Sequence, residues 1–314
     1  MTTRVYDLVM THKLDSDDYF IQCIQQLAAE ARLNFFLIEP LWAEQFFHYV
    51  KEGRIWARSL LNMHSEHHQP NDLYHRLVNL VAANGCHVID APDRARAAFD
   101  KARLHPRLVG AGISVPWTVV VPRERPPDWR LSEQEREAIG RPFVIKPAMG
   151  YGRQGLVLDA QSEADIERSI RAWPDTHYLF QKRVLPREVN ARPIYFRAFY
   201  AFGEIWVTWW NCYTDHYQLV QREEREEFGL SRVETIVRQI AELTGMTFFS
   251  TEIVQAEGGE FVVIDYVNDQ CHMLCQSAHP QKGVPDELVA AIARRLVQGI
   301  EALIRPRAPE PAAT

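Results

Sequence analysis

Residues 1–90 alternate between strand-like and helix-like segments, and this alternation restricts the fold more than any other feature of the sequence. A strand, a crossover helix and a second strand in this order are typical of a βαβ unit, in which the two strands run parallel. The apolar runs predict strands over residues 6–11, 34–39, 57–63 and 87–90. Helical spacing predicts helices over residues 17–32, 41–50 and 73–84, with Ser16 as a candidate N-cap of the first. We therefore expect an α/β domain built on a parallel sheet.

From residue 143 onward the pattern changes to closely spaced strands, which indicates an α+β arrangement in the C-terminal part. Strands are predicted over residues 143–146, 155–158, 178–182, 194–202, 205–210, 250–255 and 260–266. Helices are predicted over residues 163–173, 231–244 and 286–304, and Gly245 is the expected C-cap of the second. The stretch 122–141 is expected to be a surface excursion or a short helix, and the Pro/Ala tail at residues 307–314 is expected to be disordered.

Charge and composition argue against several classes of function. The net charge of -6 over 314 residues is modest, and Lys and Arg are spread along the chain, so we expect no nucleic-acid binding. No apolar run is long enough to cross a bilayer, and the N-terminus lacks the order of a signal peptide, so we expect a cytoplasmic protein without membrane association. The five cysteines have no paired spacing, which argues against a disulfide framework or a zinc site.

A strand that ends in a lysine is followed closely by a glycine-rich loop. Residues 143–147 read Phe-Val-Ile-Lys-Pro, and residues 150–155 read Gly-Tyr-Gly-Arg-Gln-Gly. Glycines let backbone N–H groups approach an anion closely, while Lys146 supplies a positive charge, so this segment suits phosphate binding. Its spacing fits neither the dinucleotide fingerprint nor the P-loop. By itself the segment is equally compatible with a flexible hairpin from which Lys146 extends to solvent.

Oxygen-bearing side chains follow on two of the later strands. Glu252 and Asp265 lie in apolar runs, Asn268 comes soon after, and the Gly258-Gly259 turn is expected to make the two strands antiparallel neighbours. Oxygen ligands on neighbouring strands can hold Mg²⁺ against the phosphates of a nucleotide. The alternative is an ordinary half-exposed strand face. Carboxylates in apolar surroundings are costly unless they have partners, so we expect partners for both.

Taken in order along residues 88–268, these motifs resemble the ATP-grasp superfamily, especially its carboxylate–amine ligases such as the bacterial glutamate-adding ligases, glutathione synthetase and D-alanine:D-alanine ligase. The matching segments are the entry into the first nucleotide-binding subdomain (Asp100-Lys101 to Pro116), the lysine strand and phosphate loop (143–155), the adenine hinge (179–184), the arginine-bearing strand (195–199) and the closing pair of metal-binding strands (245–268). The ordered set covers more than half of the chain and is much more specific than any single motif.

The resemblance implies ATP and Mg²⁺ as cofactors and a role for each matching residue. Lys101 and Lys146 are implied on the ATP phosphates and Arg197 near the transferred phosphate, which makes Arg197 and Lys146 the implied catalytic residues. The implied mobile lid consists of Gly150, Tyr151, Gly152, Arg153, Gln154 and Gly155. The implied adenine contacts are Gln181, Lys182, Arg183 and Val184, and the implied magnesium ligands are Glu252, Asp265 and Asn268.

The resemblance also implies an ATP-grasp fold with three domains, and one position departs from the family pattern. The domains are an N-terminal parallel-sheet pre-ATP-grasp domain (1–90) and two nucleotide-clamping subdomains (91–183 and 184–306). In the family a metal-binding Asn commonly follows the acidic ligand by two residues, whereas here Val267 takes that place and Asn268 comes one later. A β-bulge could restore Asn268 to the site, or Asp269 could take its role, so the third ligand stays open between these two.

The implied reaction is phosphoryl transfer from ATP to a carboxylate, followed by attack of an amine or another nucleophile on the acyl phosphate. Such a transfer needs positioning and charge neutralisation more than a protein nucleophile. The implied partners are a small-molecule or peptide carboxylate and the nucleophile, and a homodimer is left open. Two alternatives stand beside this interpretation: a small-molecule kinase of the same fold, in which a hydroxyl accepts the phosphate, and a nucleotide-binding regulator without turnover.

Overall fold

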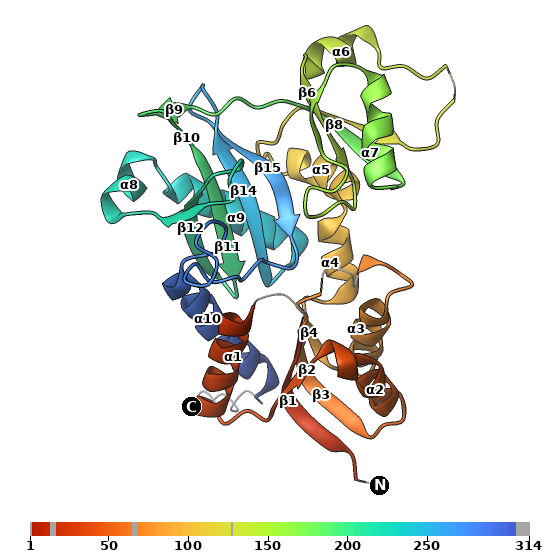
Figure 1. Cartoon of the computed structure of the whole chain (residues 1–314), viewed down its shortest axis with the longest axis vertical. Coiled ribbons are helices and arrows are strands. Elements are labelled where there is room, and N and C mark those ends of the chain that lie inside the picture. The colour runs from red at the N-terminus through yellow and green to blue at the C-terminus, as the bar shows by residue number, and fades with distance from the viewer. Residues whose placement is uncertain (1, 13–16, 65–67, 127, 306–314) are drawn as a thin grey trace, which may run out of the picture. The chain divides into compact units, whose positions relative to one another are not determined.

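The computed structural model describes residues 2–12, 17–64, 68–126 and 128–305, and the chain divides into two compact units (Figure 1). Unit 1 consists of Met1–Asp93, Ala201–Glu204 and Gln270–Thr314, and unit 2 consists of Arg94–Tyr200 and Ile205–Asp269. The candidate N-cap Ser16 and the tail at residues 307–314 lie outside the described residues. None of the described helices is long and apolar enough to cross a bilayer.

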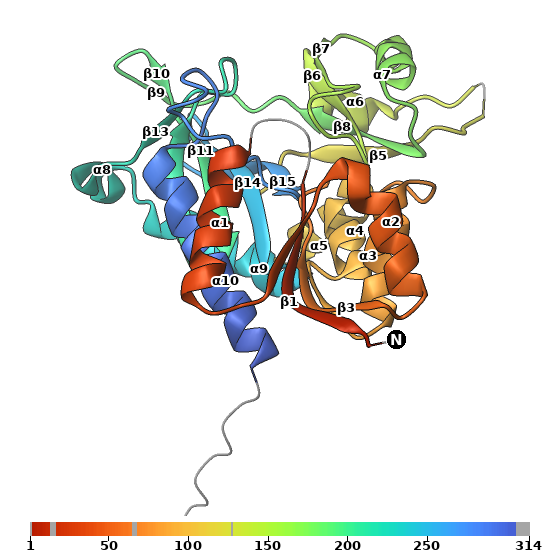
Figure 2. The same cartoon turned by 60° about the horizontal axis from the view of Figure 1, so that its bottom comes forward.

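Unit 1 contains a parallel sheet, as the alternation of its segments predicts. The strands lie in the order β2-β1-β3-β4, and each neighbouring pair runs parallel. They are β1 (Arg4–Thr11), β2 (Phe35–Ile38), β3 (Ile55–Leu61) and β4 (His87–Ile89). The helices of this unit are α1 (Asp18–Glu30), α2 (Pro40–Lys51), α3 (Leu73–Ala83) and α10 (Asp286–Ile304). Helix α1 packs on α10 and α2 on α3, and Figure 2 shows these two pairs on opposite faces of the sheet.

Local sequence signals explain how the helices of unit 1 begin and which face they bury. Pro40 lies in the first turn of α2, where its missing N–H costs nothing. Asp72 caps α3, because its carboxylate accepts a hydrogen bond from the backbone N–H of Tyr74 at 2.7 Å. Phe46 on α2 and Leu77 on α3 belong to the buried cluster that also contains residues of the sheet. The apolar faces of α2 and α3 therefore cover the parallel strands.

The first sheet of unit 2 is antiparallel and carries the lysine strand. Its order is β5-β8-β6-β7, formed by β5 (Thr118–Pro122), β6 (Phe143–Pro147), β7 (Val157–Ala160) and β8 (His177–Lys182). The helices of this region are α4 (Pro92–Phe99), α5 (Lys101–Gly110), α6 (Glu133–Ile139) and α7 (Ile166–Ala172). The helix expected over residues 163–173 is a 3-10 turn, Glu163–Asp165, followed by α7. The strand expected from Gly155 starts at Val157, because Gly155 has a left-handed backbone with φ +72°.

The second sheet of unit 2 has the order β13-β12-β11-β14-β15. Its strands are β11 (Tyr195–Ala201), β12 (Glu204–Trp210), β13 (Tyr217–Leu219), β14 (Phe248–Gln255) and β15 (Phe261–Asn268). Strands β14 and β15 are antiparallel neighbours, as the Gly258-Gly259 turn predicts, and α9 (Ser231–Thr244) ends at Gly245 with φ 69°, also as predicted. Strand β13 and helix α8 (Arg222–Glu227) were not predicted, because three residues and a short charged segment leave no apolar period to detect.

Candidate active site

The two acidic residues expected to bind magnesium lie opposite each other in the β14–β15 ladder. Glu252 pairs with Asp265, and Ser250 pairs with Asn268. Two steps along β14, from Ser250 to Glu252, correspond to three steps along β15, from Asn268 to Asp265, so β15 holds one extra residue there. This irregularity is a β-bulge of the kind that could restore Asn268 to the site. Because of it Asn268 lies beside the pair, and its side chain forms a hydrogen bond with Asp265.

Each carboxylate has the partner that its apolar surroundings require, and in both cases the partner is a cation. Arg197 on β11 donates a hydrogen bond from Nη1 to Glu252 Oε1 at 3.0 Å. The same guanidinium donates to Ser250 Oγ from Nε at 3.2 Å and from Nη2 at 3.1 Å. Lys101 Nζ forms an ion pair with Asp265 Oδ1 at 3.8 Å. These four charged side chains are all less than a fifth exposed, so their mutual attraction is weakly screened.

Burial and the neighbouring cations give the two carboxyl groups different proton affinities. Burial raises the pKa of Glu252 to about 7, although Arg197 opposes the rise. Burial also acts on Asp265, but Lys101, Lys146 and Arg197 together outweigh it and lower the pKa of Asp265. A close pair of carboxylates behaves in this way because the charge on one disfavours the charge on the other. At neutral pH, Asp265 is ionised while Glu252 lies near its midpoint.

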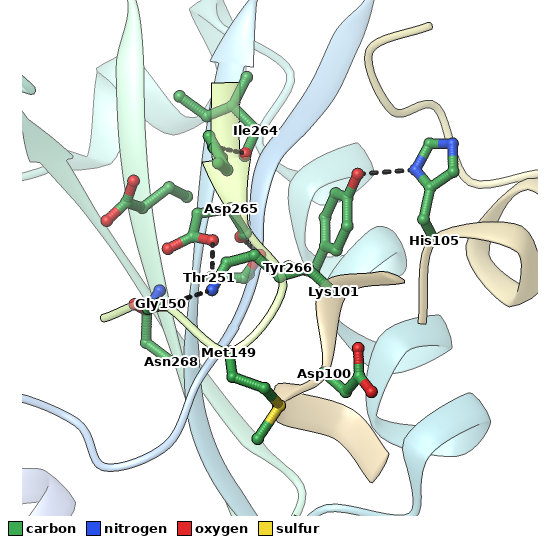
Figure 3. A network of polar contacts seen from close by, with 12 residues as sticks. Asp100, Lys101, His105, Met149, Gly150, Thr251, Ile264, Asp265, Tyr266 and Asn268 are labelled. Carbon is green, nitrogen blue, oxygen red and sulfur yellow. Dashed lines mark hydrogen bonds and ion pairs between the residues drawn. The ribbon is translucent and has the colours of Figure 1, made fainter. Parts of the chain in front are cut away.

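The two lysines expected on the phosphates reach this pair from two different elements of unit 2. Lys101 is the first residue of α5, which Asp100 caps through hydrogen bonds from the backbone N–H groups of Ala102 and Arg103. Lys101 Nζ donates to the carbonyl oxygen of Gly150 at 2.8 Å, and Figure 3 shows its side chain directed toward both Gly150 and Asp265. Lys146 Nζ donates to the carbonyl oxygen of Ile264 at 2.6 Å, so it does not extend freely to solvent. Both ammonium groups therefore lie beside β15.

The glycine loop has the backbone geometry that its composition predicts. Gly152 has φ +58° and Gly155 has φ +72°. A Cβ on Gly155 would lie 2.6 Å from Pro147 Cγ and 2.7 Å from Trp173 Cβ, so only glycine fits there. Between these glycines, Arg153 donates from Nη2 to Asp215 Oδ1 at 2.7 Å and to the carbonyl oxygen of Cys212 at 2.6 Å. The loop is thus held by Lys101 at one end and by the segment after β12 at the other.

The expected hinge lies at the end of β8, where the chain passes from the first sheet of unit 2 to the second. Gln181 is buried, Lys182 and Arg183 are exposed, and Val184 is partly exposed. The backbone N–H of Lys182 donates to the carbonyl oxygen of Trp117 at 2.8 Å. The Gln181 side chain donates to the hydroxyl of Tyr266, the residue that follows Asp265 on β15. The hinge is therefore connected to the carboxylate pair through one side chain.

Most of the residues singled out in the sequence meet in unit 2. Lys101, Lys146, Arg197, Glu252 and Asp265 contact one another or neighbouring backbone, and Asn268 joins them through the bulge. Sequence reasoning missed the polar groups that support this set, namely His105, Thr118, Asp215, Ser250 and Tyr266. Position gave one weak signal, since Tyr266 adjoins Asp265 and His105 lies one helical turn from Lys101.

The donor set suits a divalent cation only in part. Within the described ranges, no group of three or more His, Cys, Asp or Glu side chains is placed to hold a metal ion. A metal at this site would have two carboxylates and the amide oxygen of Asn268 from the protein, and oxygen ligands from another molecule would complete its coordination. Oδ1 of Asp265 is buried and accepts no hydrogen bond from the described residues. That acceptor is suitably placed for a cation.

Comparison with known proteins identifies the fold. No protein-family model matches the sequence, and the comparison with curated proteins finds no match either. Solved structures do match over nearly the whole chain. D-cycloserine synthetase DcsG is 13% identical, with 96% of this chain and 100% of that chain covered and a TM-score of 0.65. D-alanine–D-alanine ligase from Bacillus anthracis complexed with ATP is 12% identical, with 96% and 97% covered and a TM-score of 0.63.

A third structure of the same kind is the ATP-grasp ligase PsnB complexed with a minimal precursor, Mg and ADP. It is 14% identical, with 95% of this chain and 98% of that chain covered and a TM-score of 0.59. At identities this low, the structural similarity establishes the fold alone. It extends over both units of the chain. The resemblance to the ATP-grasp superfamily drawn from the order of the motifs is thus confirmed at the level of the fold, and this protein has the ATP-grasp fold.

Proposed function

We propose that the protein is an ATP- and Mg²⁺-dependent ligase that activates a carboxylate as an acyl phosphate for attack by an amine or another nucleophile. One observation carries the proposal. Three cationic side chains, Lys101, Lys146 and Arg197, lie around the Glu252–Asp265 pair in a chain with the ATP-grasp fold. Because the pKa of Glu252 is about 7, the carboxylates cancel less than two of the three positive charges at neutral pH. The excess of positive charge favours a polyanionic ligand such as a triphosphate.

The sequence-derived roles fit this arrangement. Lys101, Lys146 and the backbone N–H groups of residues 150–155 would hold the phosphates, and residues 181–184 would contact adenine. Glu252, Asp265 and Asn268 would hold Mg²⁺, and the hydrogen bond from Asn268 to Asp265 favours Asn268 over Asp269 as the third ligand. Magnesium, when bound, would neutralise charge on the phosphates and orient them. Residues 91–183 and 184–306 are proposed as the two nucleotide-clamping subdomains.

Arg197 is proposed to bind the phosphoryl group during transfer to the acceptor carboxylate. Its guanidinium is fixed by three hydrogen bonds, from Nη1 to Glu252 and from Nε and Nη2 to Ser250, so little reorganisation is needed when negative charge develops nearby. Lys146 would act together with it on the transferred group. Both residues would stabilise the acyl phosphate until the nucleophile attacks, and no protein nucleophile is required.

The acceptor is proposed to be a carboxylate on a small molecule or a peptide. Structural neighbours span both classes, since DcsG is a D-cycloserine synthetase and PsnB is complexed with a precursor peptide PsnA2 and AMPPNP in another of its structures. A ligase that uses ATP would act where ATP and Mg²⁺ are plentiful, so we also propose a cytoplasmic location. A homodimer is also proposed, and the mass of the protein in solution tests it.

The test has two stages, binding and turnover. Calorimetric titration with Mg²⁺ and AMPPNP should give saturable binding, and absence of binding to a folded protein would overturn the proposal. A screen of carboxylate and amine pairs with ATP should then release equal amounts of ADP and free phosphate. A kinase reaction would release ADP while the phosphate stays on the product, and such a result would replace the ligase with a kinase of the same fold. Binding without turnover for any pair would favour a regulator.

A further inference from the structure

A connected set of buried polar groups lies behind the proposed adenine hinge. Gln181 Nε2 donates to the hydroxyl of Tyr266 at 2.8 Å and to Oγ1 of Thr118 at 3.1 Å. The Tyr266 hydroxyl lies 2.7 Å from Nδ1 of His105, and Oγ1 of Thr118 donates to the carbonyl oxygen of Pro116 at 2.7 Å. Gln181, Tyr266 and His105 are 2%, 1% and 8% exposed, so water cannot readily replace these contacts.

The count of protons in this set decides how the Gln181 amide is oriented. An amide –NH₂ has two donors, and both of those on Nε2 have an acceptor here. A flipped amide would place Oε1 against the two hydroxyls and would require both to donate to it. Thr118 cannot do so, because its single proton goes to Pro116. Tyr266 cannot do so while its single proton goes to His105.

The state of His105 therefore matters for the amide two contacts away. His105 can accept from Tyr266 at Nδ1 only when the ring is neutral and carries its proton on Nε2. Burial lowers the pKa of His105 and so keeps the ring neutral at physiological pH. In the neutral tautomer that carries its proton on Nε2, the Gln181 orientation has one solution. Among the described residues, no hydrogen bond reaches Oε1 of Gln181, which leaves this atom as an acceptor for a ligand.

We infer that Tyr266, Thr118 and His105 are positioning residues that hold the Gln181 amide with its oxygen toward the nucleotide base and thereby select adenine over guanine. This inference rests on the proposed function, because it assumes that the nucleotide base lies against residues 181–184. Adenine carries an exocyclic amine that can donate to Oε1, whereas guanine carries at the same ring position a carbonyl oxygen that can only accept. An amide fixed by two hydroxyls rejects guanine, while an amide free to flip accepts either base.

The same elements also carry the phosphate and metal residues, which gives the set a second consequence. Lys101 and His105 lie one turn apart on α5, and Asp265 and Tyr266 are neighbours on β15, so α5 contacts β15 through Lys101–Asp265 and through His105–Tyr266. Figure 3 shows both contacts in one view. The base-selecting amide is therefore built on the strand that presents the proposed magnesium ligand.

The experiment compares the affinities of two nucleotides in the full-length protein. Dissociation constants for AMPPNP and for GMPPNP are measured by calorimetry with saturating Mg²⁺ in wild type, Tyr266→Phe, Thr118→Val and Gln181→Leu. We expect the preference for AMPPNP to fall at least about tenfold in Gln181→Leu and in Tyr266→Phe, and to a smaller extent in Thr118→Val. Gln181→Leu removes the acceptor itself, and the other two substitutions each remove a hydrogen bond that fixes it. Thermal melting confirms that each variant is folded.

A matched control is available on β8, the strand that carries Gln181. Tyr178 is a fully buried tyrosine of β8 whose hydroxyl donates to the carbonyl oxygen of Trp173 at 3.0 Å and accepts from the backbone N–H of Asp175 at 2.9 Å. Tyr178→Phe removes a buried hydroxyl of equal kind but should leave the ratio of the two affinities unchanged. A substitution that only loosens the fold would lower both affinities together.

The outcomes separate this inference from the proposed function. Wild-type protein that binds neither nucleotide would overturn both. A preference that falls in Gln181→Leu but stays at the wild-type value in Tyr266→Phe and Thr118→Val would overturn the inference and leave the adenine site intact. An equal loss of both affinities in Tyr266→Phe would assign Tyr266 a structural role only and would also overturn the inference. If Tyr266→Phe does not fold, the ratio measured for Thr118→Val decides.

Discussion

Glu252 and Asp265 lie directly opposite each other on β14 and β15, yet the pKa of Glu252 is raised to about 7 while the pKa of Asp265 is lowered. Burial acts on both groups, so the difference comes from their partners. Lys101, Lys146 and Arg197 outweigh burial at Asp265, whereas at Glu252 burial and the charge of Asp265 together outweigh Arg197, Lys146 and Arg153. At neutral pH the pair therefore carries less than two negative charges.

The raised pKa of Glu252 predicts a pH-dependent stability in the absence of nucleotide and metal. A carboxyl whose pKa is higher in the folded state binds its proton more tightly there, so its stabilising effect is complete below its unfolded pKa and is lost as the pH rises through the folded value. A rise from 4.5 to about 7 corresponds to about 3 kcal/mol at most. We expect Glu252→Gln to remove this dependence and to be more stable than wild type at pH 8.

The measurement is urea unfolding of wild type and Glu252→Gln between pH 5 and pH 8. The difference between the two proteins is the relevant quantity, because His105, whose pKa burial lowers, is present in both. Asp265 contributes little to the slope here, since a lowered pKa puts its loss of stability at more acidic pH. Parallel curves for the two proteins would contradict the raised pKa of Glu252.

The second prediction concerns Lys146, which should serve nucleotide binding more than folding. Its ammonium donates a hydrogen bond to the backbone carbonyl of Ile264, and burial lowers its pKa, so the fold gains little from the charge. We expect Lys146→Ala to remain folded and to bind Mg²⁺ with AMPPNP at least about tenfold more weakly, because a charge-assisted phosphate contact is lost. Lys51→Ala, at the exposed end of α2, is the control. Equal calorimetric affinity in both variants would remove Lys146 from the site.

The third prediction separates two kinds of glycine in the loop. Gly155→Ala brings a Cβ within 2.6 Å of Pro147 and 2.7 Å of Trp173 at a φ of +72°, whereas Gly152→Ala at φ +58° meets no atom within 4 Å. Gly152→Ala should therefore cost about 1 kcal/mol of unfolding free energy for the backbone alone. Gly155→Ala should cost more, roughly 2–4 kcal/mol, because overpacking is added. Urea unfolding of both variants measures this, and equal costs would show that the neighbours of Gly155 yield without penalty.

How much of this molecule its sequence predicts depends on how local each signal is. The bounds of α9 and α10 match the helices predicted over residues 231–244 and 286–304, since long amphipathic segments with clear ends override weak propensities. The antiparallel pairing of Glu252 with Asp265 follows from the Gly258-Gly259 turn, and the late position of Asn268 made a bulge one of two alternatives, the other being Asp269 as the ligand. These features lie within a few residues of one another or on two adjacent strands.

The supporting groups could not be predicted in this way. His105 and Tyr266 are 161 residues apart, and Arg153 and Asp215 are 62 residues apart. No motif spans such pairs, and each of these residue types is common in helices, strands or loops that have no functional role. Their partnership depends on how α5, β8 and β15 pack, which is a property of the tertiary fold. Short elements such as β13 and α8 were not predicted because their sequences are too short to show a repeating pattern of apolar residues.

The last prediction is that residues 150–155 form a lid that Arg153 restrains in the free protein and that nucleotide binding closes. Without nucleotide the loop is held by Lys101 at Gly150 and by the exposed Arg153–Asp215 pair, and exposed pairs of this kind are weak, so the backbone amides of the loop should exchange quickly with solvent. Binding of Mg²⁺ and AMPPNP should slow this exchange, because the phosphates would accept hydrogen bonds from the same amides and would contact Lys101. Hydrogen exchange followed by mass spectrometry compares peptides covering residues 150–155 with the Gly258-Gly259 turn, which should not respond. In Arg153→Ala the free protein should exchange faster in the loop, while the bound protein should regain most of its protection. Slow exchange in both states of the wild type would make the loop a rigid structural hairpin and would exclude the lid.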